Sequence, residues 1–333
     1  MSTATPVAVT GAEGFIGSHL VEALVASGRP VRAMVQYNSF ASHGWLELLS
    51  PDVADCVDVV LGDVRDPGSV RELVADCDTV YHLAALIAIP YSYRAPRSYV
   101  DTNVTGTLNV LEAVREYGIP RLVHTSTSET YGTAQTVPIT EDHPIVTQSP
   151  YAASKAGGDR LADSYHASFG TPVVTLRPFN TFGPRQSMRA VIPTVIGQVA
   201  AGETKVTLGD LRPTRDFTYV EDTAAAFLAV GTAPAERVVG RTFNAGTGGE
   251  ISVGDLVRLI GRLMDTDLAV LEDARRLRPA GSEVMRLVCD AGRLREATGW
   301  APAHRLEDGL ARTIDFFRDP AHLARYKTSA YNV

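Results

Sequence analysis

The sequence has few cysteines, no cluster of metal-ligating residues and no long apolar segment. Cys56, Cys77 and Cys289 are odd in number and widely separated, so they predict neither a disulfide framework nor a metal site. The eight histidines show no His-x-x-x-His spacing, which argues against a catalytic metal. No apolar run approaches membrane-spanning length, and residues 1–6 do not read as a signal peptide. We therefore expect a cytoplasmic protein with free thiols, no bound metal and no membrane association.

Positive charge is also scarce. The formal net charge of −7 argues against a general nucleic-acid binder. Hydrophobic residues make up 45% of the chain and charged residues 21%, which is ordinary for a globular protein. A length of 333 residues allows one large domain or two unequal ones.

Lysine is rare enough to give one position unusual weight. The chain has 31 basic residues, but only three of them are lysines, and one of these is Lys155. It follows Tyr151 by four residues in a segment that Ser149 and Pro150 mark as a helix start. Tyr151 and Lys155 then share one helix face. The neighbouring ammonium is predicted to lower the pKa of the Tyr151 phenol, which would make it a general base.

The first forty residues predict a nucleotide-binding unit. Residues 7–10 read as a buried strand, 18–28 as an amphipathic helix and 30–35 as a second strand, with a glycine turn after the first strand. This order is typical of dinucleotide binding, because the glycines let the backbone approach a pyrophosphate at the helix N-terminus. The predicted cofactor contacts here are Gly11, Gly14, Phe15, Ile16 and Gly17.

The end of the second strand lacks the expected acid. NAD-binding units usually carry Asp or Glu there to hold the ribose diol, whereas this chain has Gln36, Asn38 and Ser39. No arginine occupies the position that usually grips a 2′-phosphate. We predict that Asn38 contacts the cofactor and that the cofactor is NAD, with NADP left open.

Further strands are predicted at residues 59–62, 79–85, 122–127 and 172–180, giving a doubly wound parallel α/β sheet. His82 and His124 lie within these strands and are expected to be structural. Ligands bind beyond the carboxyl ends of such strands. The residues expected there against the cofactor are Asp63, Val64, Leu83, Ala84, Ala85 and Thr125, and those beyond them are Thr127, Ser128, Glu129 and Asn180.

The connecting segments are less regular. Residues 87–94 are expected to form a loop over the site, and residues 99–116 a helix. In the second half, helices are predicted at 191–202, 252–264 and 306–317, and a strand at 205–208. Loop arginines that together suit a dianionic ligand are Arg185, Arg189, Arg212, Arg215 and Arg278.

Several long strings resemble the extended short-chain dehydrogenase/reductase superfamily over nearly the whole chain. They include Ala88-Ile-Pro-Tyr-Ser-Tyr-Arg94, Thr125-Ser-Thr-Ser-Glu129 and Arg278-Pro-Ala-Gly-Ser-Glu-Val284. The chain looks most like NAD-dependent nucleotide-sugar 4,6-dehydratases of legionaminic-acid-type pathways, with GDP-mannose 4,6-dehydratases more distant. The resemblance implies the substrate contacts Ile87, Tyr91, Asn180, Arg189, Val191, Arg215, Arg278 and Glu283.

The resemblance also implies a domain division. A Rossmann-type NAD(P)-binding domain is expected over residues 1–176, with 212–248 returning to it. A smaller C-terminal α/β domain, formed by 177–211 and 249–330, is expected to bind a nucleotide-diphosphate sugar. Small residues in the Tyr151 helix, opposite an apolar face of the helix at 103–114, predict a homodimer through a four-helix bundle; the small residues are Ala152, Ala153, Ala156 and Gly157.

Within the superfamily, Thr127-Ser128-Glu129 implies the type of reaction. Tyr151, Lys155 and Thr127 would oxidise the sugar at C4, and Glu129 would remove the C5 proton before water leaves from C6. The dTDP-glucose enzymes carry Asp where this chain has Ser128, so the acid for the C6 hydroxyl stays open.

Three other activities are compatible with the superfamily. A 4-epimerase leaves Glu129 without a role. A UDP-glucuronate decarboxylase often has Arg after the catalytic lysine, where this chain has Ala156. A non-catalytic dinucleotide sensor typically loses the Tyr/Lys pair, which is intact here.

Overall fold

The computed structural model describes residues 5–328 and 330. Within them, seven parallel strands form one sheet in the order β3-β2-β1-β4-β5-β6-β11. The strands are β1 Val7–Thr10, β2 Val31–Gln36, β3 Val57–Gly62, β4 Thr79–His82, β5 Leu122–Thr125, β6 Val173–Pro178 and β11 Thr242–Ala245. The predicted doubly wound α/β fold is confirmed.

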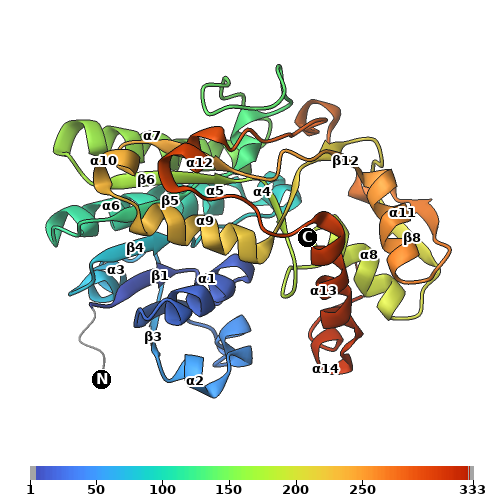
Figure 1. Ribbon diagram of the computed structural model, residues 1–333, viewed down its shortest axis with the longest axis horizontal. Coiled ribbons are helices and arrows are strands. Elements are labelled where there is room, and N and C mark those ends of the chain that lie inside the picture. Colours follow the sequence, from blue (N-terminus) through green and yellow to red (C-terminus); the bar gives the residue numbers. More distant parts are fainter. Residues whose placement is uncertain (1–4, 329, 331–333) are drawn as a thin grey trace.

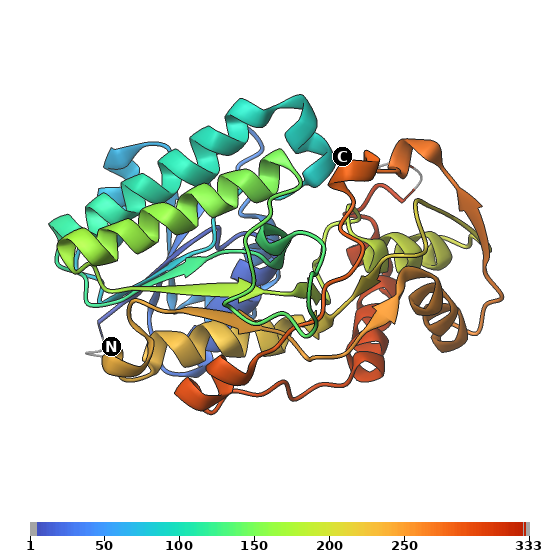
Figure 2. The same cartoon turned by 90° about the horizontal axis from the view of Figure 1, so that it is seen from above.

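Helices cover both faces of this sheet. On one face α1 (Phe15–Ala26) packs beside α9 (Val220–Thr232). On the other, α3 (Pro67–Val74), α6 (Gly106–Glu116) and α7 (Pro150–Phe169) lie side by side, and Figure 2 shows α6 and α7 above the sheet and α9 below it. Each face buries its own apolar cluster, with Phe227 and Leu24 on the α9 side and Leu111 and Val70 on the α6 side. Strands covered on both faces are buried throughout, as β1 is.

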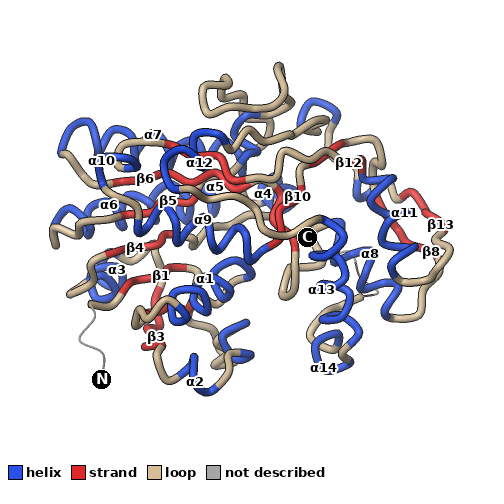
Figure 3. The backbone as a smooth tube through the Cα atoms, in the orientation of Figure 1, coloured by secondary structure: helices blue, strands red, loops and turns tan. Residues whose placement is uncertain are grey.

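A smaller lobe follows the sheet and has its own core (Figures 1 and 3). Its helices are α8 (Val191–Ala200), α11 (Val253–Leu263), α13 (Leu306–Arg318) and α14 (Pro320–Leu323). Its strands pair two by two as β10 (Phe217–Tyr219) with β7 (Asn180–Phe182), β12 (Ile251–Ser252) with β9 (Thr214–Arg215), and β13 (Ala269–Glu272) with β8 (Lys205–Leu208). The core is formed by Phe182, Ile196, Val206, Ile260 and Phe317.

Short elements complete the chain. The short helices are α2 (Pro51–Ala54), α4 (Ile89–Arg94), α5 (Pro96–Tyr99), α10 (Ala235–Val238) and α12 (Gly292–Thr298). Tighter 3₁₀ turns lie at Gly44–Leu48, Ser128–Tyr131, Ala274–Arg276 and Ala280–Ser282. Among the described residues, no helix has the length and apolarity required to cross a bilayer.

Two connections differ from the sequence-based prediction. The segment at 87–94 is largely the helix α4 rather than a loop, because Pro90 lies in the first turn, where its missing N–H costs no hydrogen bond. The predicted helix at 99–116 is present, but it continues from α5 and its residues Val100–Thr105 are π-helical before α6 begins. A π-helical turn inside a longer helix often marks a functional region, and this one contains the buried Asn103.

Both lobes are held together on the α1 side of the molecule. Arg185 forms an ion pair with Glu22 of α1 at 2.8 Å. At the chain's far end, Arg325 pairs with Glu47 at 3.1 Å, and Tyr326 packs against Trp45 with ring centroids 5.6 Å apart.

Candidate active site

The glycine turn is packed tightly against the end of β4. Gly11 has a φ of +68°, and a Cβ built on it would lie 2.8 Å from the Ala84 nitrogen. A Cβ on Gly17 would lie 2.0 Å from the Gly11 oxygen. Leu83 and Ala84 donate backbone hydrogen bonds of 3.1 Å to the hydroxyl of Thr10, which ties the two strand ends together. No side chain larger than hydrogen fits at these two glycines without moving the backbone.

The N-terminus of α1 opens from this turn. Gly14 is its N-cap and provides no side-chain hydrogen bond, so the first-turn amides have no capping acceptor from that residue. Phe15 and Ile16 continue the helix and pack against the core of the smaller lobe. The turn therefore fits a pyrophosphate, which would supply the missing acceptors.

Tyr151 and Lys155 lie one turn apart on α7 and are both buried, with 8% and 3% of their surface exposed. The helix begins as predicted, because Ser149 accepts a hydrogen bond from the Ala152 nitrogen and Pro150 occupies the first turn. This start places Tyr151 at the edge of the sheet beside Thr127.

The prediction that the pKa of Tyr151 is lowered is wrong for the protein without bound cofactor. Burial raises the pKa of Tyr151 well above its usual range, and the hydrogen bond with Thr127 offsets only part of this rise. The charge of Glu129 raises it further. Burial also lowers the pKa of Lys155 to about 8, with Asp159 acting in the opposite direction. Because both side chains are desolvated, burial is the largest effect on the pKa of each.

Asp159 lies one turn beyond Lys155 and anchors a buried polar network that the sequence analysis missed. It accepts a hydrogen bond of 2.6 Å from Ser126 and forms an ion pair of 2.9 Å with Arg177. His124 contacts its other oxygen at 3.1 Å. These partners outweigh burial and lower the pKa of Asp159 to about 2. The sequence offered one indication of this role, because Asp159 follows Lys155 by four residues and so lies on the same helix face.

Both strand histidines are structural, as predicted. His82 is fully buried, and its two ring nitrogens contact the hydroxyls of Thr10 at 2.8 Å and Thr107 at 3.1 Å. It stacks on His124, with ring centroids 5.9 Å apart.

The Thr127-Ser128-Glu129 triplet forms a tight turn just beyond β5. The Thr127 hydroxyl accepts a hydrogen bond of 3.3 Å from the Glu129 nitrogen, and Ser128 is buried. The Glu129 side chain is 12% exposed, and its carboxylate lies 3.9 Å from a guanidinium nitrogen of Arg278. A carboxylate therefore lies at the same sheet edge as the Tyr151 phenol.

Two of the five grouped arginines converge near this carboxylate. Arg215 and Arg278 lie 3.3 Å and 3.6 Å from the same oxygen of Glu283. The five loop arginines, which together are expected to suit a dianionic ligand, do not all gather here. Arg185 is used by Glu22 of α1, and Arg212 by Asp210, which is two residues away. These ion pairs satisfy the two guanidiniums without a ligand.

Three tyrosine rings form a row beside the site. The centroids of Tyr91 and Tyr99 are 6.2 Å apart, and those of Tyr99 and Tyr151 are 6.3 Å apart. Burial raises the pKa of Tyr99 to about 12, and the nearby charge of Arg189 partly opposes this rise. Arg189 itself is exposed, as is Ile87, at 56%. Tyr99 was not among the predicted site residues, since its place depends on the helix α5.

The remaining predicted residues differ in whether their side chains are already paired within the protein. The side-chain oxygens of Thr125 and Asn180 are buried and have no hydrogen-bond partner within residues 5–328 and 330, so both have capacity for a ligand. Asp63 is occupied by Arg65, with a hydrogen bond of 3.0 Å from Nε to each carboxylate oxygen. Val64 is buried, Ala85 is half-buried after β4, and Val191 is half-buried at the start of α8.

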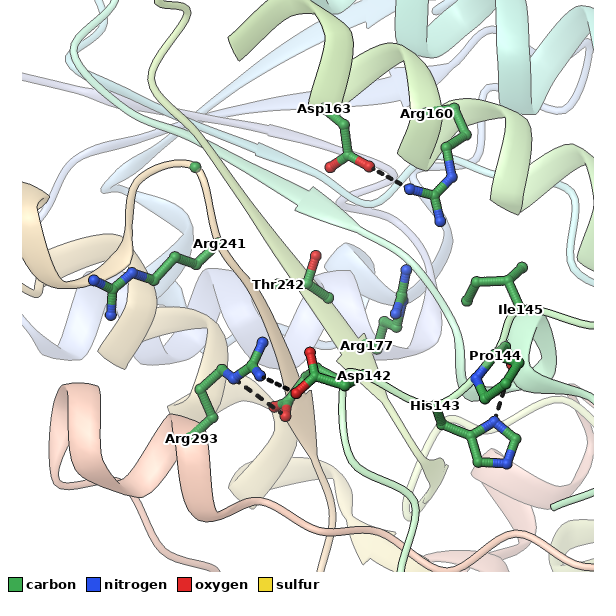
Figure 4. A pocket seen from close by; sticks show the side chains of 12 residues that line it. Asp142, His143, Pro144, Ile145, Arg160, Asp163, Arg177, Arg241, Thr242 and Arg293 are labelled. Atoms are coloured by element: carbon green, nitrogen blue, oxygen red, sulfur yellow. Dashed lines mark hydrogen bonds and ion pairs between the residues drawn. The ribbon is translucent and has the colours of Figure 1, made fainter. Parts of the chain in front are cut away.

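A separate cavity of about 490 Å³ lies between β6, β11 and the loop at 141–145 (Figure 4). Two of its arginines pair with acids of the same wall, Arg160 with Asp163 and Arg293 with Asp142, both at 2.9 Å. None of the predicted catalytic residues lines it.

A parallel sheet with a glycine turn at one strand end and a Tyr-x-x-x-Lys pair at another is the arrangement of extended short-chain dehydrogenases/reductases. Comparison with known proteins narrows this class. Residues 8–313 match the sequence model of the family described as GDP-mannose 4,6 dehydratase, and the chain belongs to this family.

Relatives with two activities resemble the chain to nearly the same degree. It is 34% identical to a dTDP-glucose 4,6-dehydratase of Xanthomonas campestris pv. campestris, covering 93% of this chain and 92% of the relative. It is 33% identical to a UDP-glucose 4-epimerase of Mycolicibacterium smegmatis, covering 93% and 98%. The chain is therefore an enzyme of the nucleotide-sugar dehydratase and epimerase group.

A solved structure supports NAD as the cofactor. A double mutant of dTDP-glucose 4,6-dehydratase from Streptomyces venezuelae, with NAD bound, has a TM-score of 0.83 and 28% sequence identity. The similarity covers 96% of this chain and 98% of that one. The predicted NAD cofactor agrees with this complex.

Proposed function

We propose that the protein is a nucleotide-sugar 4,6-dehydratase that converts a nucleotide-diphosphate sugar to its 4-keto-6-deoxy form and releases water. The observation that carries the proposal is the position of Glu129. Its carboxylate lies beyond β5, close enough to Tyr151 for its charge to raise the phenol pKa. Proton removal from C5 needs such a base beside the group that acts at C4.

The residues around the glycine turn would hold the cofactor. Gly11, Gly14 and Gly17 would admit the pyrophosphate, and the unpartnered hydroxyl of Thr125 lies at the adjacent strand end. NAD supplies the hydride acceptor at C4, the hydride donor at C6, and a positive charge that favours the Tyr151 phenolate.

The chain's own residues would then move the protons. Tyr151 takes the proton of the C4 hydroxyl, while Thr127 hydrogen-bonds the C4 oxygen and Lys155 favours the phenolate. The C5 proton becomes acidic beside the C4 ketone, and Glu129 removes it. The C6 hydroxyl leaves as water after it gains a proton from Glu129 or from a water molecule held by Ser128. C6 would then regain the hydride and C5 a proton, which returns Tyr151 and Glu129 to their starting protonation states. The cycle has no net oxidation or reduction.

The smaller lobe would bind the nucleotide and the diphosphate. Arg215 and Arg278 are held in place by Glu283, which leaves two guanidiniums at the mouth of the site. We propose the domain division at residue 176, and within the returning segment 212–248 we assign α9 and β11 to the main domain, because β11 pairs with β6 of the main sheet. Residues 214–219 instead pair with strands of the smaller lobe. The three free cysteines are compatible with a cytoplasmic enzyme.

A 4-epimerase is the second candidate, because an epimerase relative is 33% identical over 93% of this chain. Mass analysis of products from a panel of nucleotide sugars separates the two. A dehydratase product loses the mass of one water, whereas an epimerase product keeps the mass of its substrate.

Catalytic turnover should not accumulate free NADH. The hydride taken from C4 returns to C6 of the same sugar, so each cycle restores the cofactor. The measurement is nicotinamide absorbance during many turnovers, read beside product formation. Growth of reduced cofactor in proportion to product would instead indicate a simple dehydrogenase.

A homodimer is expected through α6 and α7. These helices pack closely, and a Cβ on Gly157 would lie 3.3 Å from Val104. Ala153 of α7 and Val100 of the π-helical stretch before α6 are exposed, whereas Ala152 is buried within the subunit and contributes no outer surface. Light scattering at micromolar concentration should give twice the chain's mass. A monomer at that concentration would contradict the proposal.

A further inference from the structure

The missing acid at the end of β2 leaves the cofactor's ribose without an obvious partner, and Asn38 does not fill the gap. Its amide nitrogen donates to the backbone oxygens of Gln36 at 3.2 Å and Ser42 at 2.8 Å. Its side-chain oxygen accepts from the backbone nitrogens of Phe40 and Ser42, both at 3.2 Å. Both donor hydrogens and the acceptor are therefore used inside the 36–42 loop.

Glu13 supplies a carboxylate at this strand end from the glycine turn instead. One of its oxygens accepts a hydrogen bond of 3.1 Å from the backbone nitrogen of Gln36, the last residue of β2. The backbone oxygen of Glu13 accepts a second bond, of 3.0 Å, from Trp45. A Cβ on Gly44 would lie 2.8 Å from that same oxygen, so the turn at 44–48 closes tightly on Glu13. The carboxylate is thus fixed between the glycine turn and β2.

The second carboxylate oxygen of Glu13 is buried and unpaired within the part of the chain that the structure describes. Burial raises the pKa of this carboxyl, and the hydrogen bond from Gln36 offsets the rise only in part. A buried acceptor without a donor is costly, and in native proteins such a group usually has a role or a missing partner. The partner here should be a hydrogen-bond donor.

We propose that Glu13 accepts a hydrogen bond from the adenosine ribose of the bound dinucleotide and thereby selects NAD over NADP. The inference rests on the proposed dinucleotide site at the glycine turn. A ribose 2′-hydroxyl provides the donor that the second oxygen lacks. A 2′-phosphate provides only acceptors and negative charge, and a buried carboxylate repels it. The acid expected at the end of β2 is in this way replaced by one that precedes Gly14.

The test is calorimetric binding of NAD and NADP to protein freed of nucleotide, with ADP and adenosine 2′,5′-bisphosphate as probes of the adenosine half. Wild-type protein should bind NAD at least tenfold more tightly than NADP. In Glu13→Gln this preference should fall by about tenfold or more, mainly because the 2′-phosphate is no longer repelled. Glu13→Ala should in addition weaken NAD and ADP binding by about tenfold. Asp52→Asn removes one charge from the exposed helix α2 and should leave the preference unchanged.

Melting of each variant without ligand shows whether it is folded. A preference that stays within twofold of wild type in folded Glu13→Gln and Glu13→Ala would overturn the role of Glu13 and leave the dinucleotide site intact. Equal binding of NAD and NADP by wild-type protein would overturn it as well. A wild-type chain that binds neither dinucleotide would overturn the proposed site itself, and the role of Glu13 with it.

Discussion

Tyr151→Phe is expected to abolish the appearance of reduced nicotinamide when a substrate is added to the NAD-loaded enzyme. The variant keeps the ring and its packing against Tyr99, so folding should be preserved. It loses the phenolate oxygen that, in the proposed cycle, accepts the proton of the C4 hydroxyl beside Thr127. General bases contribute about 10²- to 10⁴-fold, and the first hydride transfer should slow by at least this factor. The measurement is nicotinamide absorbance in a single turnover.

Tyr99→Phe provides a matched control. It removes a phenol hydroxyl from the neighbouring ring of the same aromatic row, where that hydroxyl donates to the Ala88 oxygen. Oxidation at C4 should persist in this variant, because Tyr99 has no proton to accept in the proposed cycle. If Tyr151→Phe reduces the cofactor as fast as Tyr99→Phe, Tyr151 is not the base at C4.

The helices and strands predicted best from the sequence are those in which the spacing of apolar residues is regular from end to end. The strand at 205–208 agrees with β8 at both ends, and the helix at 252–264 differs from α11 by one residue at each end. Ser252 gives α11 a clear start, because its hydroxyl accepts from the Asp255 nitrogen. The strand at 79–85 was predicted too long. Its last residues turn away from the sheet to donate to the Thr10 hydroxyl, a contact 73 residues distant that no local pattern contains.

The chemistry of the site depended on burial and pairing, which the sequence shows poorly. The Tyr151 and Lys155 positions follow from helix spacing, but the direction of the Tyr151 pKa follows from desolvation. The acidic partner of each arginine decides its role, and these partners are distant in sequence: Arg185 pairs with Glu22, and Arg215 pairs with Glu283. The first pair depends on how the two lobes meet and the second on how distant segments of the chain come together, and residue order alone determines neither.

Ser128 leaves a specific question about the leaving hydroxyl. The resemblance places an aspartate at this position in dTDP-glucose enzymes, and this chain is 34% identical to one of them. Ser128 is buried and cannot protonate a hydroxyl at neutral pH. In the proposed cycle the proton would therefore come from Glu129 after it has taken the C5 proton, or from water. Glu129 would then act twice in one cycle, and its loss should affect elimination more than oxidation.

Glu129→Gln should separate these two steps. The change is nearly isosteric and should leave folding and NAD binding intact. Tyr151, Lys155 and Thr127 remain, so substrate addition should still reduce the bound cofactor. The variant should then stall with the 4-keto sugar and reduced nicotinamide trapped together, and water loss should slow by at least ~10²-fold. Absorbance in a single turnover, read beside product mass, follows both steps.

Glu283→Gln is the matched control, because it makes the same chemical change in the same group of charges. Glu283 holds Arg215 and Arg278 and has no proton to remove in the proposed cycle. Its variant should bind substrate more weakly but pass from oxidation to elimination without a trapped ketone. If Glu129→Gln dehydrates at the wild-type rate, Glu129 is not the C5 base. A product of unchanged mass from the wild-type enzyme would then favour the epimerase, because an epimerase needs Tyr151, Lys155 and Thr127 but no carboxylate at position 129.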